Sequence, residues 1–422
     1  MKSSTTTKIL CGLILAIIFA GSASGGGQSN PRSMAMGGAY TALAYGLEAG
    51  FYNPANLGLS LNKKFSLDLV TVGAEIKNNS FSLKDYNEYN GRFWNEEDKQ
   101  AILDLIPAEG LRFNATAEAS GMNFSIWRLA FNFRGRGESM LQLNKDPFEL
   151  LLFGNEVRPG VYLNNNRGEA IAIGDASISY GQPLFKWTGG EFAVGATFHY
   201  FYGFAHQEII EASGGILTTD SGFVGDAQAV IRSALGGSGQ AVDLGASMIF
   251  AKNWVISAGL ENLYSKIKWD KETEETRFTF QMDPVTLETL LDSEDDDSLT
   301  ETSDTTYPIG SFTTTLPAQL KLGIAKLGRK LTIAFDWSQA TSSKYSQSTN
   351  PRVAGGLEYK PIGLLPLRIG AATGGNKGTI LSGGLGLHFG PFHMDMAIAG
   401  CGSFIPAASK GVAFAYGIGL RF

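Results

Sequence analysis

The end of the chain alternates strictly between two kinds of side chain, which constrains the fold more than any other feature. Every second residue from Val412 to Phe422 is large and apolar, and the residues between them are Ala413, Ala415, Gly417, Gly419 and Arg421. Successive side chains of a β-strand point to opposite faces of the sheet. A soluble sandwich would bury the large face and place charged residues on the other. A second face of glycine and alanine instead predicts a wall with lipid outside and a crowded lumen inside.

The same alternation recurs upstream, in 192–204, 242–250, 254–260, 331–338, 381–389 and 392–398. Glycine makes up 53 of the 422 residues, and charged residues only 18%. This glycine content is well above the usual share of about 7%, and the alternating strands place much of it on the inward face. Beyond the N-terminal region, no apolar run reaches the roughly 18 residues that a membrane-spanning helix requires.

The connections between these strands also alternate in length. Short turns are expected near Trp127-Arg128, 181–190, Lys252-Asn253, 327–330, 361–366 and Gly390-Pro391. Longer loops are expected near 77–108, 135–168, 206–239, 265–315 and 339–351, with smaller ones at 373–378 and 401–409. Short turns on one side and long loops on the other are typical of outer-membrane barrels. We therefore predict an all-β protein, a transmembrane antiparallel β-barrel of about 14 strands over residues 64–422; a secreted β-sandwich is the alternative.

The N-terminus predicts export. Lys2 and Lys8 precede an apolar run from Ile9 to Ala20, and small residues follow at a possible cleavage site. Residues 1–24 therefore resemble a secretory signal peptide, with a buried N-terminal helix as the alternative. Its removal would leave Cys401 as the one cysteine, which excludes an intramolecular disulfide framework.

Two of the predicted loops contain features of their own. Residues 95–106 have a helical pattern, and we expect a short helix packed on the barrel rim. The loop 283–304 holds an acidic run from Asp292 to Asp297. A calcium site is conceivable there, but the run lacks the glycine and bidentate glutamate of an EF-hand, so a solvated acidic loop is the preferred interpretation.

Residues 25–63 do not alternate and contain two recognisable runs. The first is Arg32-Ser33-Met34-Ala35-Met36-Gly37-Gly38-Ala39-Tyr40-Thr41-Ala42, and the second is Asn53-Pro54-Ala55-Asn56-Leu57. Both resemble the N-terminal motifs of the FadL-like outer-membrane proteins, the FadL/TodX group with its PorV-like relatives. Asn56 stands where that group usually has glycine.

This resemblance implies a 14-stranded barrel whose N-terminal segment, residues 25–63, folds inward as a plug or hatch. Gly37 and Gly38 would let the backbone approach the wall closely. Pro54 restricts Asn53 to extended conformations, and the Asn53 amide can bond backbone groups inside the lumen. Together with Ala55 these are the candidate plug and substrate residues, and an ordinary N-terminal turn is the alternative.

Polar residues of the last strands are the remaining candidates for a site. His388 and His393 flank the Gly390-Pro391 turn and should point inward, with Asp395 on the same face. They could bind a metal or act as acid and base, but we interpret them as polar lining of the lumen. The sequence contains no H-E-x-x-H, G-x-S-x-G or Walker-type motif, so we expect no enzyme activity, cofactor or metal. The pI of about 5.4 argues against a nucleic-acid partner.

The leading hypothesis is a FadL-like channel in the outer membrane for hydrophobic small molecules such as long-chain fatty acids. The alternative is a PorV-like, non-transporting barrel that docks secreted or surface proteins, and an enzyme using His388 or His393 is a third possibility. Expected partners are outer-membrane lipids, a hydrophobic ligand, and the barrel-assembly machinery through Phe422.

Overall fold

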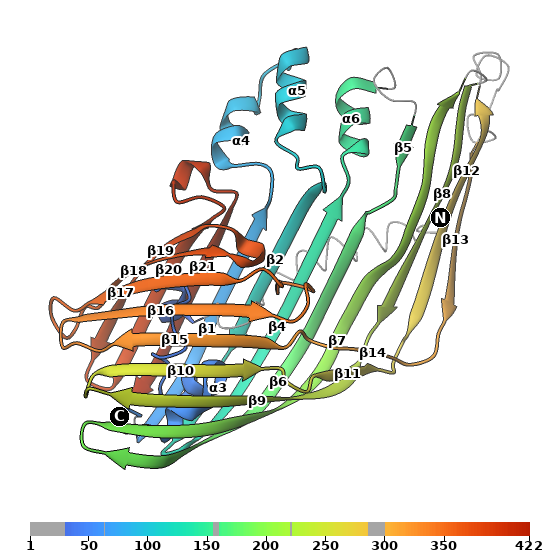
Figure 1. The fold of residues 1–422 in the computed structure, drawn as a ribbon. Coiled ribbons are helices and arrows are strands. Elements are labelled where there is room, and N and C mark those ends of the chain that lie inside the picture. The colour runs from blue at the N-terminus through green and yellow to red at the C-terminus, as the bar shows by residue number, and fades with distance from the viewer. Residues whose placement is uncertain (1–29, 63, 155–159, 220–221, 286–299) are drawn as a thin grey trace.

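The structure is a computed structural model that describes residues 30–62, 64–154, 160–219, 222–285 and 300–422. It is an antiparallel barrel from which one part of the wall projects well beyond the rest (Figure 1). Within these residues, no helix has the length and apolar character needed to span a membrane. The predicted signal peptide, residues 1–24, lies outside the described residues.

The first half of the wall contains strands β1 to β9. Their bounds are β1 (Phe65–Asn78), β2 (Leu111–Ser120), β3 (Asn123–Ile126), β4 (Leu129–Leu143), β5 (Gly160–Tyr162), β6 (Arg167–Trp187), β7 (Gly190–Thr219), β8 (Gly222–Ala234) and β9 (Gly237–Phe250). Several are pieces of one pass through the wall: β2 and β3 both pair with β1 and β4, and β8 leads directly into β9.

The second half contains strands β10 to β21. Their bounds are β10 (Trp254–Glu261), β11 (Lys266–Trp269), β12 (Glu274–Val285), β13 (Thr300–Pro308), β14 (Phe312–Thr314), β15 (Gln319–Lys326), β16 (Leu331–Ala340), β17 (Arg352–Tyr359), β18 (Leu367–Gly374), β19 (Ile380–Phe389), β20 (Phe392–Cys401) and β21 (Gly411–Arg421). β10 to β12 form one pass and β13 to β15 the next, so the wall has 14 passes, and β21 closes it against β1. The predicted 14-stranded barrel is confirmed.

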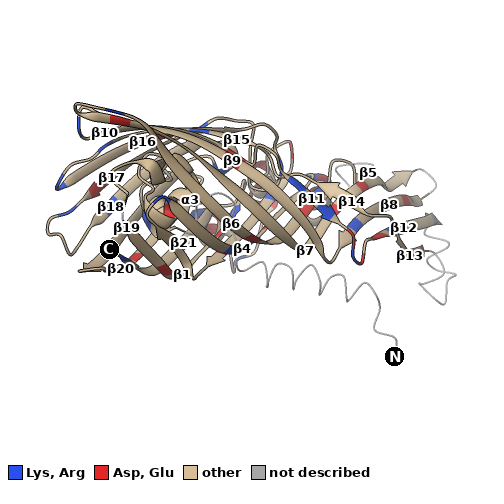
Figure 2. Ribbon diagram, turned by 90° about the horizontal axis from the view of Figure 1, so that it is seen from below, with Lys and Arg blue, Asp and Glu red and all other residues tan. Residues whose placement is uncertain are grey.

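The predicted alternation is confirmed in the closing strand. The outward Val412 and Phe414 are 62% and 45% exposed, whereas the inward Ala413 and Ala415 are 3% and 0% exposed. Uncharged residues dominate the length of the wall strands (Figure 2). In the closing strand the large side chains therefore form an apolar outer surface, and the small ones face the lumen.

All the predicted short turns are present, but 181–187 belongs to β6, so that turn is only Thr188-Gly189. The predicted loops 135–168, 206–239 and 265–315 are wrong over much of their length. β4 continues to Leu143, β7 runs on to Thr219 and pairs with β8, and β11 to β14 fill most of 265–315. Beyond the lipid, neither face of a strand has to be apolar, so the two-residue period fades although the hydrogen-bonded ladder continues.

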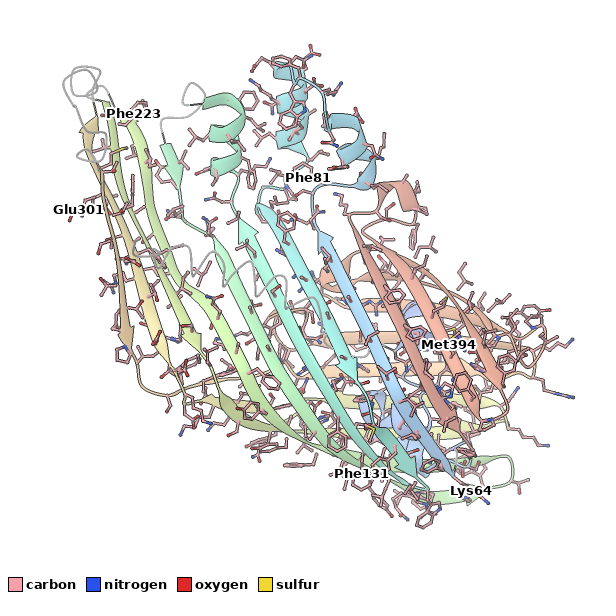
Figure 3. All side chains as sticks on the ribbon, turned by 180° about the vertical axis from the view of Figure 1, so that it is seen from behind. Lys64, Phe81, Phe131, Phe223, Glu301 and Met394 are labelled. Carbon is pink, nitrogen blue, oxygen red and sulfur yellow. The ribbon has the colours of Figure 1, made fainter. Side chains whose placement is uncertain are left out.

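The tips of strands β7, β8, β12 and β13 form the projection, which we call the projecting sheet. Phe223 and Glu301 lie at its far end, while Lys64 and Phe131 lie near the short turns at the opposite end of the molecule (Figure 3). β13 pairs with β12 alone among the described strands, so its second edge is open. The acidic run at 292–297 lies outside the described residues, and the end of the predicted loop, 300–304, is part of β13.

Three helices lie on the long-loop side: α4 (Leu83–Tyr89), α5 (Glu96–Asp104) and α6 (Asp146–Phe153). α5 confirms the helix predicted at 95–106. The other two were not predicted, although Ser82 and Asp85 form a capping box at the start of α4 that is readable in the sequence. Two 3₁₀ turns, η5 (Gly375–Lys377) and η6 (Pro406–Ala408), complete the loops.

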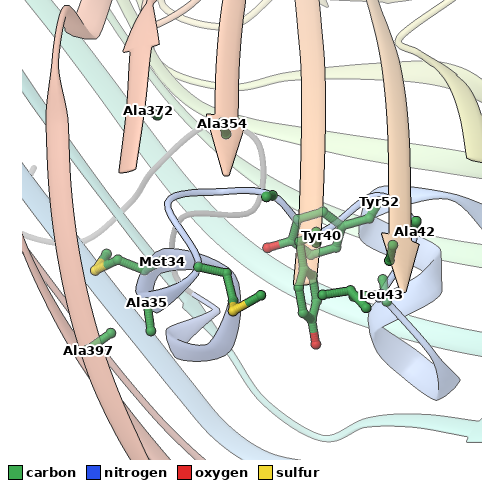
Figure 4. Close-up of a cluster of buried hydrophobic side chains, with 14 of the residues drawn as sticks. Met34, Ala35, Tyr40, Ala42, Leu43, Tyr52, Ala354, Ala372 and Ala397 are labelled. Carbon is green, nitrogen blue, oxygen red and sulfur yellow. The ribbon is translucent and has the colours of Figure 1, made fainter. Parts of the chain in front are cut away.

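Residues 30–62, here called the N-terminal segment, lie inside the barrel towards the short-turn end (Figure 1). The segment forms α2 (Pro31–Ala35), η1 (Gly46–Glu48), α3 (Ala49–Tyr52) and η2 (Pro54–Gly58). Its apolar side chains pack against inward alanines of the wall, such as Ala35 beside Ala397, and the rings of Tyr40 and Tyr52 meet edge to face at 4.9 Å (Figure 4). The barrel interior near the short turns is therefore a packed core.

Candidate functional site: the lumen and its N-terminal segment

Inward glycines of the wall make room for the backbone of the N-terminal segment. A Cβ atom at Gly356 would lie 2.6 Å from the Met36 carbonyl oxygen, and one at Gly323 would lie 2.9 Å from Thr41 Cβ. The same holds for the backbone facing Gly181, Gly195 and Gly370. Two backbones can approach this closely only where a side chain is missing, so much of the glycine excess is explained by contact with this segment.

Gly37 and Gly38 lie where the segment touches β17, β18 and β19. Both have positive φ values, 69° and 89°, which glycine adopts without strain. The Gly37 N–H donates to Ser382 Oγ at 3.1 Å, and Arg352 Nη2 donates to the Gly37 carbonyl at 2.7 Å. A Cβ atom at Gly37 would lie 2.8 Å from Ala371 N. The double glycine thus joins the segment to the wall through its backbone.

Asn53 joins the segment to a different part of the wall, strands β9 and β10. Its side-chain amide donates to the carbonyls of Ala246 on β9 and Ala258 on β10, at 3.2 and 3.0 Å. Its side-chain oxygen accepts from the Ala55 N–H at 3.0 Å and caps η2, in which Pro54 occupies the first position. The extended conformation expected of Asn53 is observed, with φ −159° and ψ 105°.

Asn56, which sequence reasoning treated only as a departure from the family motif, is fully buried and makes several hydrogen bonds. Its amide donates to the carbonyls of Thr41 and Ala44, both at 2.9 Å. Its oxygen accepts from Ser247 Oγ at 2.5 Å and from Ser257 Oγ at 3.3 Å. A glycine could make none of these side-chain bonds, so this chain has a polar link that the usual motif lacks.

Glu48 is the centre of the first charged cluster near the short turns. Arg421 Nη2 lies 2.7 Å from its carboxylate, and Tyr40 Oη and Asn30 Nδ2 donate to it at 2.6 and 2.8 Å. Burial alone would raise the pKa of this carboxyl. Arg421 and Arg32 outweigh burial, and the pKa of Glu48 lies below its ordinary value. Glu48 is therefore charged, and it links the segment to the last strand.

The second charged cluster contains Asp395 on β20, one of the three polar residues of the last strands that the sequence suggested as lumen lining. Arg32 makes two hydrogen bonds to Glu358, at 2.8 and 3.0 Å. Arg368 then joins Glu358 to Asp395, at 2.7 and 2.6 Å. These contacts place Asp395 in a continuous ionic network that reaches the N-terminal segment.

His388, His393 and Asp395 are brought together as expected. His388 Nε2 lies 3.2 Å from Asp395 Oδ1, and the two histidine rings are 6.0 Å apart. His393 lines a cavity of about 30 Å³ together with Asp68 and Arg421. Over the described part of the chain, no three His, Cys, Asp or Glu side chains form a group that could hold a metal ion. The roles of these three residues and of the motif residues remain predictions.

A third cluster, on the far wall, was missed by sequence reasoning. His199 on β7 lies between Asp175 on β6 and Asp243 on β9, with nitrogen–oxygen distances of 2.9 and 3.0 Å. Arg134 on β4 pairs with Asp175 at 2.7 Å, and its guanidinium lies 4.8 Å from the Phe51 ring centroid of the segment. These residues belong to different strands, and only the register of the barrel aligns them.

Above the segment, on the long-loop side, lies a partly open cavity of about 100 Å³. Gly37, Gly38 and Thr41 form part of its floor, and Ser346 and Asn376 from two loops form part of its ceiling. The lumen therefore holds a packed N-terminal segment below and a small space above it.

Comparison with known proteins identifies the family. The model of the family described as "Family of unknown function (DUF5723)" matches residues 54–228 and 219–398. The chain belongs to this family. No curated protein matches the chain.

Solved structures share the fold of this DUF5723 protein. The toluene transporter TbuX from Ralstonia pickettii is 16% identical, with 93% of this chain and 98% of TbuX covered and a TM-score of 0.52. The monoaromatic hydrocarbon channel CymD is 12% identical, with 95% and 99% covered and a TM-score of 0.53. The predicted FadL-like barrel fold is therefore confirmed. This fold, with its apolar outer wall, places the protein in the outer membrane.

Proposed function

We propose that this protein is an outer-membrane channel for the uptake of hydrophobic small molecules, and that the N-terminal segment is its plug. The observation that carries the proposal is how the lumen is filled. The segment is held by side-chain hydrogen bonds, ion pairs and packing, and it adds no strand to the barrel ladder. The similarity in fold to the toluene transporter TbuX and the hydrocarbon channel CymD supports the same function.

The contacts suggest how such a plug would move. The ion pairs Arg32–Glu358 and Glu48–Arg421 hold its first part, and Asn53 and Asn56 hold its last part. None of these contacts belongs to the hydrogen-bonded ladder between wall strands. A hydrophobic substrate that packs against apolar groups in the lumen would supply about 0.8 kcal/mol for each buried CH₂ group. Long-chain fatty acids and monoaromatic compounds are both candidate substrates.

Uptake is tested with purified protein reconstituted in liposomes. Labelled toluene and fatty acids of several chain lengths are supplied outside, and their arrival at a trapped internal acceptor is measured. Accumulation above that of protein-free liposomes is expected for at least one of them. If none is taken up by correctly folded protein, the transport proposal is wrong.

Movement of the plug is tested by cysteine accessibility in a Cys401→Ala background. Ser247 lies beneath Asn56 and is 1% exposed, and Ser247→Cys is nearly isosteric. A maleimide should label this cysteine slowly at rest and faster while substrate is transported. Ser60→Cys, at an exposed position of the same segment, is the matched control and should be labelled at one rate throughout. Transport without any change in Ser247→Cys labelling would contradict plug movement.

A second candidate function is docking of an exported protein, favoured by the open edge of β13. Backbone amides at a strand edge can pair with an added strand. A stable exported partner that protects the β13 amides from hydrogen exchange would support this function. Loss of the partner in Thr305→Pro, with uptake unchanged, would separate docking from transport.

A further inference from the structure

Four short turns lie side by side at one end of the barrel, and we call them the turn row. They are residues 186–191, 250–254, 326–331 and 359–367, and their tips lie one above another along the left edge of Figure 1. Backbone hydrogen bonds connect each turn to the next, with donors and acceptors in the pairs Lys252–Gly189 (3.0 Å), Leu327–Asn253 (2.8 Å) and Lys360–Lys330 (2.8 Å). Short turns of outer-membrane barrels face the periplasm, so the turn row is one continuous periplasmic surface.

Basic side chains are concentrated in the turn row. They are Lys186, Lys252, Lys326, Arg329, Lys330 and Lys360. Lys186 is 3.3 Å from Glu191 and Lys360 is 3.0 Å from Glu358, and these carboxylates are only 5% and 1% exposed. The other four basic residues are exposed and form no ion pair with a carboxylate of the described residues. The turn row therefore has a positive charge that the protein itself does not neutralise.

Lys326 indicates what this charge faces. It is exposed at the end of β15, on the same face as Leu320 and Leu322, which are 38% and 44% exposed on the outer wall. Its Nζ lies 5.4 Å from the ring centroid of Trp254 on the neighbouring strand β10. A lysine at the end of a lipid-facing surface keeps its ammonium group among the lipid headgroups. Lys326 is therefore directed towards lipid, not towards the space below the turns.

Aromatic side chains beside the same turns mark the membrane surface. Trp187 and Tyr359 are 46% and 48% exposed, and the rings of Phe250 and Trp254 stack at 6.1 Å. Trp and Tyr are enriched where the hydrocarbon of a bilayer meets its headgroups. Since these rings are next to the basic residues in sequence, the charge of the turn row lies at the depth of the headgroups of the periplasmic leaflet.

This arrangement selects one class of lipid. Lys and Arg side chains near a bilayer attract headgroups that have a net negative charge. A zwitterionic headgroup also has a phosphate, but its own ammonium group is repelled by the same side chains. An acidic protein below the turns could meet Lys252, Arg329 and Lys330, but it would not reach the lipid-facing Lys326.

We propose that the turn row binds anionic phospholipids of the periplasmic leaflet. The phosphates lie at Lys252, Lys326, Arg329 and Lys330, and the acyl chains lie along outward residues such as Leu322. This binding is separate from the proposed uptake of hydrophobic compounds. It is measured without transport, so it can succeed or fail whatever the uptake assay shows.

The experiment measures the lipids at the surface of the full-length protein in phosphatidylcholine nanodiscs. Spin-labelled phosphatidylglycerol and spin-labelled phosphatidylcholine are added in turn, and the fraction immobilised by the protein is read from electron paramagnetic resonance spectra. Phosphatidylglycerol should associate about 3-fold more strongly or better, and the preference should weaken in high salt. Equal association of the two lipids would overturn the proposal.

Two variants test whether the turn row is the site. The triple variant Lys252→Gln, Arg329→Gln, Lys330→Gln should lower the preference for phosphatidylglycerol to below about 1.5-fold, and Lys326→Gln should lower it in part. The control replaces three exposed basic residues on the long-loop side, Lys84, Lys271 and Arg277, with Gln and should keep the native preference. Heat resistance on gels verifies that each variant is folded.

Three results would contradict the assignment. One is an unchanged preference in the folded triple variant. Another is an equal loss in the control, which would mean that net charge alone attracts the lipid. The third is a triple variant that keeps the preference but no longer binds an acidic periplasmic protein, because the turn row would then dock a protein instead of lipid.

Discussion

The closed part of the barrel and the projecting sheet are built from the same kind of ladder but differ in what surrounds them. In the closed part, strands such as β16 to β21 face lipid on one side and the N-terminal segment on the other, and the inward residues are almost all buried. In the projecting sheet, β13 is exposed along nearly its whole length, and one of its edges pairs with no strand of the described residues. The difference shows that backbone pairing alone does not determine which residues a strand can tolerate; the neighbours on its two faces do.

The largest effect should come from a substitution that adds a side chain at an inward glycine of the closed part. A side chain at Gly370 would overlap the backbone at Met36 and Gly37. Gly370→Val should therefore prevent the segment from seating and abolish the compact, heat-resistant form that folded barrels show on gels. Gly383→Val lies on the neighbouring strand, where the nearest atom to a new Cβ is 3.8 Å away, and should fold normally. Equal behaviour of the two variants would contradict the proposed role of the inward glycines.

Removal of the Asn56 side chain should have the next largest effect. Asn56→Ala leaves the buried carbonyls of Thr41 and Ala44 without their donor. At about 1–3 kcal/mol for each of these two groups, the free energy of unfolding in urea should fall by about 2–6 kcal/mol. Asn90→Ala, in an exposed loop, is the control, with an expected change below about 0.5 kcal/mol.

A smaller effect should appear in how the free energy of unfolding depends on pH. Because the pKa of Glu48 is lower in the folded protein than its ordinary value of 4.5, its contribution to stability is present above pH 4.5 and is lost as the pH falls below that value. Unfolding free energies measured between pH 3 and pH 7 should therefore depend less on pH in Glu48→Gln than in the native protein. Identical pH profiles would show that the Glu48 cluster does not stabilise the segment.

The smallest effect is expected in the projecting sheet. Thr302 is exposed on β13 and is distant from the lumen, so Thr302→Ala should change the unfolding free energy by less than about 0.5 kcal/mol. Thr332→Ala, at an inward position of β16 that is 4% exposed, should cost more. A larger loss for Thr302→Ala would mean that the projecting sheet supports the closed barrel.

Much of the closed part could be predicted from the sequence, because lipid on one side and a packed lumen on the other impose a two-residue period. The projecting sheet could not, since its strands face water and the alternation fades after residues such as His206. The loops predicted at 206–239 and 265–315 were therefore wrong, although the hairpins that replace them continue the same strands.

In the candidate site, contacts between side chains could be predicted only for residues that lie close together in the sequence. His388, His393 and Asp395 are separated by a single turn, and their proximity followed from strand geometry. His199 and Asp243 are 44 residues apart, and no local pattern indicates their contact. The hydrogen bonds of Asn56 were hidden for a related reason, since its partners include Ser247 and Ser257 on strands far along the chain.

The seam between β1 and β21 has a consequence for assembly. It joins the first and last strands of the wall, and the Phe422 N–H donates to the Phe65 carbonyl at 2.9 Å. Arg421, next to this seam, contacts Glu48 inside the barrel. A segment that is wrapped by the wall cannot easily be threaded in after the ring is complete. We therefore expect residues 30–62 to enter the lumen before the seam closes, with the Arg421–Glu48 pair forming at the same place.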